Sequence, residues 1–327
     1  MRYLDVCAGI SASTVAWKPL GWEAAAYSEI EAAPRAILAH HYPDTPLHGD
    51  FTTIRGDEYG PIDLLVGGTP CQDFSVAGLR AGLDGDRGNL SLEFLRLADR
   101  TRPRWLVWEN VPGVLSIDGG RAFGAILGGL GQLGYGFAYR VLDAQHFGVP
   151  QRRRRVFVVG CLGDWRRAGA VLFERHSLSG HPAQIRRPGA VVAAFTANGV
   201  GTCGPDDNQA QAGHIIAFSA KDRGADALND CSPTIRAGGH AGSHANAGVM
   251  PAVLRPGEDP RKVTPREVER CFGFPDDYTL VPYRKGVMAD GPRYKALGNS
   301  MAVPVMRWIG ERIAAVEALA QAKDLAA

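Results

Sequence analysis

The chain has 327 residues, a length that predicts one large domain accompanied by a smaller one. Hydrophobic residues make up 45% of the sequence, which is enough for a sizeable core and excludes an intrinsically disordered protein. The net charge of +2 provides no global field that would mark a nucleic-acid-binding protein. Nine arginines nevertheless lie between Gln151 and Ala190 against two acidic residues, a stripe that fits a phosphate-binding face and a solvated loop about equally.

The six cysteines are scattered, with neither a CxxC pair nor histidines at a matching spacing, so no metal site is expected. The first residues run directly into a predicted strand without the layout of a signal peptide, and no apolar run approaches the length of a membrane span. These features predict a protein of the reducing cytoplasm that has no membrane segment.

Strands and helices alternate from the start of the chain. Residues 3–7 predict a first strand, and a turn of small residues around Gly9 then opens a helix. A second strand over residues 24–28 ends at Glu29 and is followed by a helix over 31–41. The carboxylate of Glu29 is placed to accept hydrogen bonds from ribose hydroxyls, or is an ordinary acidic residue at a helix start. Together with Gly9 it favours a nucleoside-containing cofactor. A third strand-like segment ends near Asp50, whose carboxylate could bind an adenine amino group.

Cys71 follows a short apolar run over residues 62–66 that predicts a buried strand ended by two glycines and a proline. In an open α/β sheet this is the edge at which ligands bind, so the thiol is a candidate nucleophile. A lone cysteine is more often a buried structural residue. The catalytic interpretation gains weight from a strand over residues 105–109 that delivers Glu109 to the same edge.

The segment 76–89 contains four glycines, and it predicts either a mobile loop that closes over a substrate or a plain connection. A helix over 91–100 follows it. Two further strands are predicted over 135–141 and 155–159. Alternate arginines on an extended segment share a face, so Arg153 and Arg155 are expected to work together on an oxyanion or a phosphate.

From about Gly169 to Pro260 the sequence becomes rich in glycine, alanine and polar residues, and it predicts a loop-dominated insert with short strands over 191–195 and 214–218. Regular structure returns at Thr264, an N-cap residue followed by proline at the first helical position. A last amphipathic helix is expected after residues 294–304. We therefore expect a catalytic cofactor-binding domain of residues 1–168 and 292–327 and a target-recognition domain of residues 169–291.

With these residues in place, the chain resembles the C5-cytosine DNA methyltransferase family along almost its whole length. Six segments carry the resemblance in the family's order: Pro-Cys-Gln at 70–72, Glu-Asn-Val at 109–111, Gln-x-Arg-x-Arg at 151–155, Thr-Pro-Arg-Glu at 264–267, Gly-Phe-Pro at 273–275 and Gly-Asn-Ser at 298–300. One motif departs from the family pattern. Where the family has Phe-x-Gly-x-Gly, this chain has Cys7 in place of the aromatic residue and Ser11 in place of the second glycine.

The resemblance implies a Rossmann-like S-adenosylmethionine-dependent methyltransferase sheet with helices on both faces, plus a smaller loop-rich target-recognition domain. It implies that Cys71 attacks C6 of a flipped cytosine while Glu109 shares a proton with N3 and Arg155, helped by Arg153, holds O2. The methyl group then passes from S-adenosylmethionine to C5. The implied cofactor pocket is formed by Cys7, Gly9, Ile10, Glu29, Ile30, Asp50, Phe51, Pro70, Leu90, Asn299 and Ser300.

The resemblance also implies double-stranded DNA as the substrate. A loop over residues 72–89 would close over the extruded base, with Gln72, Ser75, Arg80 and Arg87 as DNA contacts. Thr234 and Ile235 match the Thr-Ile/Leu/Val pattern of family recognition domains, a pattern that an ordinary strand start would show as well. The following Arg236 could contact a guanine edge or a phosphate. A cognate restriction endonuclease is the candidate protein partner, the expected state is a monomer, and the expected location is the cytoplasm, in association with the nucleoid.

Three other functions remain open at this stage. The same chemistry on RNA, as in the tRNA-modifying branch of the family, is disfavoured by the long insert. A catalytically silent DNA-binding relative is disfavoured by the presence of Cys71, Glu109 and Arg155. A nicotinamide oxidoreductase is disfavoured because the first turn lacks a GxGxxG motif.

Overall fold

A computed structural model describes residues 1–70, 90–174, 216–218, 228–229, 231–235, 252–254 and 261–324. The chain divides into two compact units. The first comprises residues 1–142, 154–181 and 305–327, and the second comprises residues 143–153 and 182–304. These units do not coincide with the expected domains: residues 169–181 group with the first unit, and residues 143–153 and 292–304 group with the second. Their backbone and side chains are tied to that unit, as the contacts of Arg153 show below.

The first unit is built on a seven-stranded sheet with the order β3-β2-β1-β4-β5-β7-β6. Neighbours from β3 to β5 run parallel, whereas β7 runs antiparallel to β5. The strands are β1 Arg2–Val6, β2 Glu23–Ser28, β3 Leu47–His48, β4 Leu64–Gly68, β5 Trp105–Asn110, β6 Tyr135–Asp143 and β7 Arg154–Leu162. The predicted open α/β sheet is confirmed. Strands β1, β4 and β5 are buried almost throughout, as expected where helices cover both faces.

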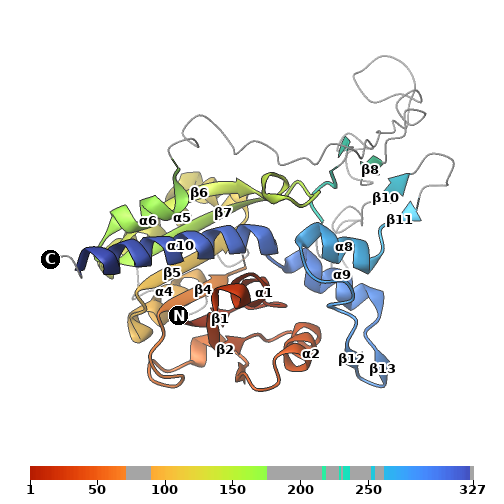
Figure 1. The fold of residues 1–327 in the computed structure, drawn as a ribbon, viewed down its shortest axis with the longest axis horizontal. Coiled ribbons are helices and arrows are strands. Elements are labelled where there is room, and N and C mark those ends of the chain that lie inside the picture. Colours follow the sequence, from red (N-terminus) through yellow and green to blue (C-terminus); the bar gives the residue numbers. More distant parts are fainter. Residues whose placement is uncertain are drawn as a thin grey trace, which may run out of the picture. The chain divides into compact units, whose positions relative to one another are not determined.

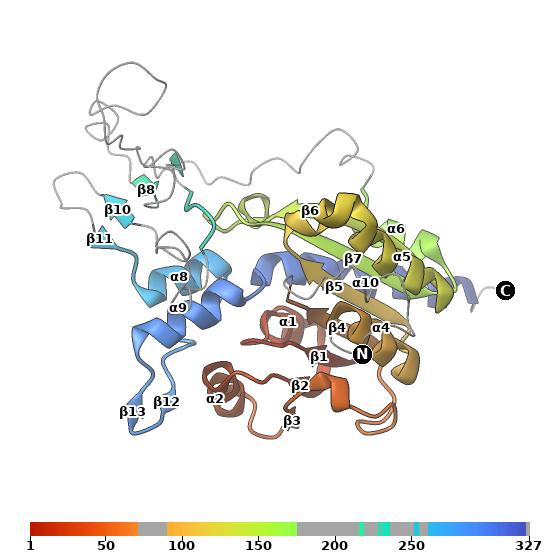
Figure 2. The same cartoon turned by 180° about the vertical axis from the view of Figure 1, so that it is seen from behind.

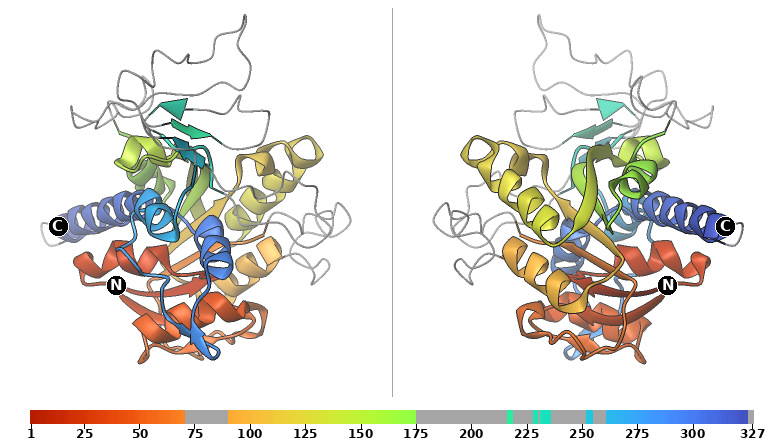
Figure 3. Two further views of the ribbon diagram at one scale, coloured as in Figure 1. Left: turned by 90° about the vertical axis from the view of Figure 1, so that its right-hand side faces the viewer. Right: turned by 90° about the vertical axis from the view of Figure 1, so that its left-hand side faces the viewer.

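The helices of this unit form a layer on each face of the sheet (Figures 1, 2 and 3), with α1, α6 and α10 on one face and α4 and α5 on the other. Their bounds, together with that of α2, are α1 Ala12–Trp17, α2 Ala32–His41, α4 Leu90–Thr101, α5 Arg121–Gln132, α6 Trp165–Leu172 and α10 Val303–Asp324. Among the described residues, no helix is long and apolar enough to cross a membrane.

The two faces are packed differently. Buried leucine, isoleucine and phenylalanine side chains of α4 and α5 join the sheet in one hydrophobic cluster. On the other face, the Trp17 ring lies edge-on to Tyr3 with centroids 5.1 Å apart, and its Nε1 donates to the Met306 carbonyl at 2.7 Å. Gly310 permits this close approach of α10 to α1, because a Cβ there would lie 2.4 Å from the Trp17 ring.

Strand β4 begins and ends two residues later than the sequence suggested, and the two glycines belong to it rather than ending it. Gly67 pairs with Val6 of β1 and with Trp108 of β5, and a Cβ on Gly67 would lie 2.8 Å from the Val6 side chain. Backbone pairing with two neighbours therefore extends the strand through residues that have a low intrinsic preference for it.

Within its described residues, the second unit contains a four-stranded sheet with the order β11-β10-β8-β9, the hairpin of β12 and β13, and the α-helices α8 and α9. The elements are β8 Ile216–Phe218, β9 Leu228–Asn229, β10 Ala252–Leu254, β11 Arg261–Lys262, α8 Pro265–Phe272, β12 Pro282–Tyr283, β13 Gly286–Val287 and α9 Asp290–Asn299. The predicted start of α8 is confirmed. Thr264 caps it in a reciprocal capping box with Glu267, and Gly273 ends it with a φ of 80°.

Candidate active site at the carboxyl edge of the sheet

The sheet brings the ends of β1, β2, β4 and β5 to one edge, because these strands run parallel. The direction of the strand order reverses between β1 and β4, and ligands of open α/β folds bind beside this switch point. The residues that follow these strands include Cys7, Glu29 and Thr69, and Glu109 lies at the end of β5. The structure thus collects at one edge several residues that are separated in the sequence.

Gly9 and Glu29 meet as the sequence suggested. The Gly9 amide donates to Oε2 of Glu29 at 2.8 Å, and Oε1 accepts the amides of Ile30 and Glu31, also at 2.8 Å. Burial raises the pKa of Glu29, while these three N–H donors favour its charged form. Gly9 has a φ of 55°, the left-handed region in which glycine carries no Cβ penalty.

The turn after β1 also contains two non-glycine residues in the left-handed region, Cys7 at a φ of 49° and Ser11 at 51°. The Ser11 hydroxyl donates to the Asp5 carboxylate at 2.7 Å and accepts the Thr14 amide at the start of α1. The Ser13 hydroxyl also donates to Asp5. Desolvation is the main reason that the pKa of Asp5 rises to about 7. Ser11, which replaces a family glycine, is therefore held by a buried polar network.

The other expected cofactor residues of the first unit vary in exposure. Ile30 is 73% exposed, so its side chain is available as an apolar surface beside the Glu29 carboxylate. Asp50 is exposed and accepts the Thr52 amide at 3.0 Å, whereas Ile10 and Phe51 are buried. Two further expected residues complete the set in this unit: Pro70 is exposed, and Leu90 packs against the hydrophobic cluster at the start of α4.

Glu109 and Arg155 form an ion pair, with Nε of Arg155 3.0 Å from Oε1 of Glu109. Glu109 faces Phe157 across the antiparallel pairing of β5 and β7, so Arg155 is its diagonal neighbour on the same face of the sheet. Both side chains are largely buried, with 12% and 14% exposed for Glu109 and Arg155 respectively. A carboxylate and a planar cation side by side suit a ring that presents a nitrogen and a carbonyl oxygen.

Thr69, two residues before Cys71, is held from three directions. Its backbone carbonyl accepts from Nδ2 of the Asn110 side chain at 2.9 Å, and Oδ1 of the same side chain accepts the Val111 amide at 2.9 Å. Its hydroxyl bonds to Nε1 of Trp108 at 2.9 Å and to the Ser91 hydroxyl at 2.7 Å. Thr69 and Asn110 are both buried. The backbone that enters the Pro-Cys-Gln segment is thereby fixed next to Glu109.

Arg153 does not share the surroundings of Arg155. It belongs to the second unit, where its guanidinium donates to the carbonyls of Ile235, Gly298 and Ser300 at 3.0, 3.1 and 2.7 Å. Only 3% of Arg153 is exposed. Chain alternation alone suggested that the two arginines act together, but β7 begins at Arg154 and Arg153 lies before it. Arg153 therefore fixes backbone within the second unit.

Three more expected site residues belong to the second unit. Asn299 is exposed at the end of α9, and the Ser300 hydroxyl donates to the Met301 carbonyl at 3.0 Å. The Thr234 hydroxyl donates to the Arg152 carbonyl at 2.6 Å, which ties it to the strand-like segment 150–153. Six expected residues lie outside the described part of the chain: Cys71, Gln72, Ser75, Arg80, Arg87 and Arg236.

The sequence analysis missed Asp5, Thr69 and the hydroxyls that surround them. A signal was present in both places. Asp5 interrupts an otherwise apolar strand and is followed by Ser11, Ser13 and Thr14, which are short-range hydrogen-bond partners for a buried carboxylate. Within the described residues, no group of three or more His, Cys, Asp or Glu side chains could hold a metal ion.

A mainly parallel sheet with a left-handed turn after β1, an acidic residue after β2 and an ion pair at the end of β5 is the arrangement of a Rossmann-like cofactor-binding fold. The fold is that of S-adenosylmethionine-dependent DNA methyltransferases. The chain aligns with Dnmt2 of Schizosaccharomyces pombe with a TM-score of 0.66 and 17% identity, covering 97% of this chain and 99% of that one. The methyltransferase EhMeth of Entamoeba histolytica aligns with a TM-score of 0.61 and 15% identity, covering 96% and 97%.

The chain belongs to the C-5 cytosine-specific DNA methylase family, which it matches over residues 1–315. It is thus a DNA methyltransferase, in a family that uses a covalent cysteine mechanism. The type II methyltransferase M.HpaII of Haemophilus parainfluenzae is 29% identical over 95% of this chain and 88% of its own. M2.BsuMI of Bacillus subtilis is 29% identical over 96% and 75%. A protein of Escherichia phage P1 named DNA N-6-adenine-methyltransferase is 32% identical over 95% of this chain, which spans 61% of that relative.

Proposed function

We propose that this chain methylates C5 of one cytosine within a short sequence of double-stranded DNA, with Cys71 as the nucleophile. The observation that supports this most directly is the ion pair of Glu109 and Arg155, at 3.0 Å. It lies beside Thr69, whose carbonyl and hydroxyl are held by hydrogen bonds with Asn110, Trp108 and Ser91. Residues 70 and 71 follow Thr69 directly, so the Pro-Cys-Gln segment begins next to a residue that hydrogen bonds hold in place. A thiol delivered there would act on a ring that Glu109 and Arg155 hold.

The residues after β1 and β2 fit S-adenosylmethionine as the methyl donor. The left-handed turn at Gly9 leaves backbone close to the switch point without a Cβ, and Glu29 offers carboxylate lone pairs for ribose hydroxyls. Ile30 offers an exposed apolar surface for the adenine, and Asp50 offers a carboxylate for its amino group. Bound there, the cofactor supplies an electrophilic methyl group on a sulfonium. Cys7, Ile10, Phe51, Pro70, Leu90, Asn299 and Ser300 complete the proposed pocket.

The chain's own residues prepare the cytosine for this methyl group. Carbon 5 of cytosine is a weak nucleophile, so the Cys71 thiolate first forms a bond to C6 while Glu109 provides a proton at N3. The electron pair released toward C5 then accepts the methyl group. Arg155 holds O2 and stabilises the charge that develops there. Loss of the C5 proton to a base and expulsion of the Cys71 sulfur restore the aromatic ring. Arg153, which we expected to assist at O2, has its guanidinium bound to three backbone carbonyls of the second unit.

A cytosine stacked in a duplex hides both C6 and C5, so the base must be flipped out. We propose that Gln72, Ser75, Arg80 and Arg87 contact DNA from the segment that follows the nucleophile, and that Thr234 and Arg236 belong to the target-reading part, residues 169–291. The type II relatives suggest a cognate endonuclease as partner. We propose a monomer that acts in the cytoplasm on nucleoid DNA.

The name of the phage P1 relative points to a different atom, the N6 amine of adenine. Transfer to an exocyclic amine requires no thiol, because the amine nitrogen can attack a methyl group directly. The cysteine of the Pro-Cys-Gln segment and the glutamate of the Glu-Asn-Val segment would then have no role in the reaction. They favour C5 of cytosine, and adenine labelling is an outcome that the experiment below can detect.

The test is incubation of purified protein with labelled S-adenosylmethionine and mixed-sequence duplex DNA, followed by mapping of methylated bases at single-base resolution. We expect label at C5 of cytosine within one short motif. Cys71→Ala should abolish transfer while changing cofactor affinity by no more than a few-fold. Cys161→Ala is the matched control, because Cys161 pairs with Trp105 at the opposite end of β5 and its loss should leave turnover intact.

Other outcomes would each remove part of the proposal. Turnover that survives in Cys71→Ala would exclude Cys71 as the nucleophile. Label confined to adenine would replace the target atom, and label on RNA with none on DNA would replace the substrate. Glu109→Gln should lower the rate strongly, because the amide cannot give up a proton to N3.

A further inference from the structure

The hairpin of β12 and β13 in the second unit has a fixed base and an exposed tip. Val281 and Met288 are buried at its base, and the Met288 amide donates to the Val281 carbonyl at 2.9 Å. The pairing of Pro282 with Val287 and of Tyr283 with Gly286 leaves Arg284 and Lys285 in the turn. Both are exposed, and Val287 beside them is 63% exposed. The tip is therefore exposed to solvent above a buried base.

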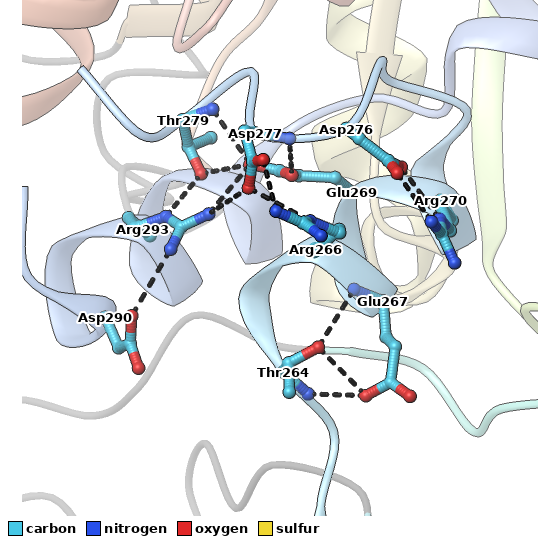
Figure 4. A network of polar contacts seen from close by, with 10 residues as sticks. All are labelled: Thr264, Arg266, Glu267, Glu269, Arg270, Asp276, Asp277, Thr279, Asp290 and Arg293. Carbon is cyan, nitrogen blue, oxygen red and sulfur yellow. Dashed lines mark hydrogen bonds and ion pairs between the residues drawn. The ribbon is translucent and has the colours of Figure 1, made fainter.

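The carboxylates around this hairpin are all committed to arginines of the same unit. Residues 261–304 contain eight basic and five acidic residues. Figure 4 shows most of the ion pairs on α8, α9 and the intervening loop. Every acidic residue of this segment is paired: Glu267 with Arg261, Glu269 with Arg293, Asp276 with Arg270, Asp277 with Arg266, and Asp290 with Arg293.

This arrangement leaves the charge of the tip uncompensated. Within the described residues, no ion pair involves Arg284 or Lys285. The Arg284 guanidinium instead lies over the Tyr283 ring, 5.2 Å from its centroid, which orients it without neutralising it. The two cations consequently present a local positive charge that no carboxylate among the described residues balances.

The backbone at the tip adds a second observation. Arg284 has a φ of 54°, the left-handed region in which a residue with a Cβ is disfavoured and glycine is the usual choice. The chain nevertheless places an arginine there, although the next-but-one residue is Gly286. Backbone strain at an exposed residue points to a function for its side chain rather than to folding.

We propose that the β12–β13 tip binds the phosphate backbone of DNA, with Arg284 and Lys285 each contacting one phosphate. The inference rests on the proposed function, since it takes DNA as the substrate. The planar guanidinium can bind two phosphate oxygens at once, and the lysine adds a point charge. Phosphate contacts carry no base information, so the hairpin contributes affinity and register and leaves sequence choice to other residues.

The experiment compares wild-type protein with the double variant Arg284→Gln, Lys285→Gln. The dissociation constant for a labelled duplex is measured by fluorescence anisotropy from 50 to 200 mM KCl. Loss of two phosphate contacts should lower the slope of log K against log salt by about 1.8, so the salt-induced weakening over this range becomes about tenfold smaller. The change should be equal for DNA with and without the methylation motif.

A matched control removes two exposed cations elsewhere, by Lys18→Gln and Arg307→Gln in the first unit. Its salt slope should equal that of the wild type. Arg284→Gly provides a second variant, because relief of the left-handed strain should raise the melting temperature while DNA binding weakens. An unchanged slope in the double variant, or an equal change in the control, would overturn the hairpin proposal. Wild-type protein that neither binds nor methylates DNA would overturn the proposed function instead.

Discussion

The buried Asp5 carboxylate should make the first unit less stable as the pH rises from 5 to 8. Its pKa in the folded protein is about 7, whereas the ordinary value is 3.8. Between these values the unfolded chain has lost the proton and the folded chain keeps it, so each rise in pH favours unfolding. Below 3.8 both states are protonated and the full stability remains; above 7 the loss is complete.

The magnitude follows from the width of this window. Within this window, each pH unit lowers the free energy of unfolding by about 1.36 kcal/mol. The loss between pH 5 and pH 7 is therefore about 3 kcal/mol. Asp5→Asn removes the titrating group and keeps an oxygen that can accept from the Ser11 hydroxyl. The free energy of unfolding of the variant, relative to the wild type, should therefore increase by about 3 kcal/mol between pH 5 and pH 8.

Urea unfolding followed by tryptophan fluorescence measures this difference in the correct part of the molecule. All six tryptophans of the sequence belong to the first unit, so the signal reports on that unit alone. Asp44→Asn, a substitution of an exposed carboxylate, is the control and should show no such trend. A difference between Asp5→Asn and wild type that stays constant over this pH range would refute the reasoning. It would mean that the hydroxyls of Ser11 and Ser13 stabilise the charged carboxylate fully.

Two further substitutions test the packing that positions the site, and a third serves as a control. Asn110→Ala should lower the free energy of unfolding by about 2–4 kcal/mol, because it leaves the Thr69 carbonyl and the Val111 amide without partners. It should also slow turnover at temperatures where the variant remains folded. If the free energy of unfolding, followed by tryptophan fluorescence, did not change, water would have replaced both hydrogen bonds. Gly310→Ala should cost about 1–3 kcal/mol through its clash with the Trp17 ring. Gly124→Ala, at an exposed position of α5, should instead raise the free energy of unfolding by about 0.5–1 kcal/mol. Thermal melting should therefore show a lower melting temperature for Gly310→Ala and a higher one for Gly124→Ala.

Short-range patterns in the sequence were sufficient for most of the elements. Apolar runs bounded by small residues located β1, β2 and β5 to within one or two residues, and Thr264 with the following proline located the start of α8. These features depend on residues that are neighbours in the chain. Strand β4 was misplaced because its last two residues are glycines, whose pairing with β1 and β5 leaves no local trace.

The sequence by itself determined that an acidic residue, Glu109, would end a strand at the ligand edge and that arginines would follow later in the chain. It could not decide which arginine reaches that carboxylate. The tertiary structure decided it, because β7 pairs antiparallel with β5 in a register that sets Arg155 diagonally across from Glu109. Arg153, two residues earlier, precedes the strand and is bound by three carbonyls of the second unit. Strand register is a property of the pairing between distant segments, and alternation along one segment does not contain it.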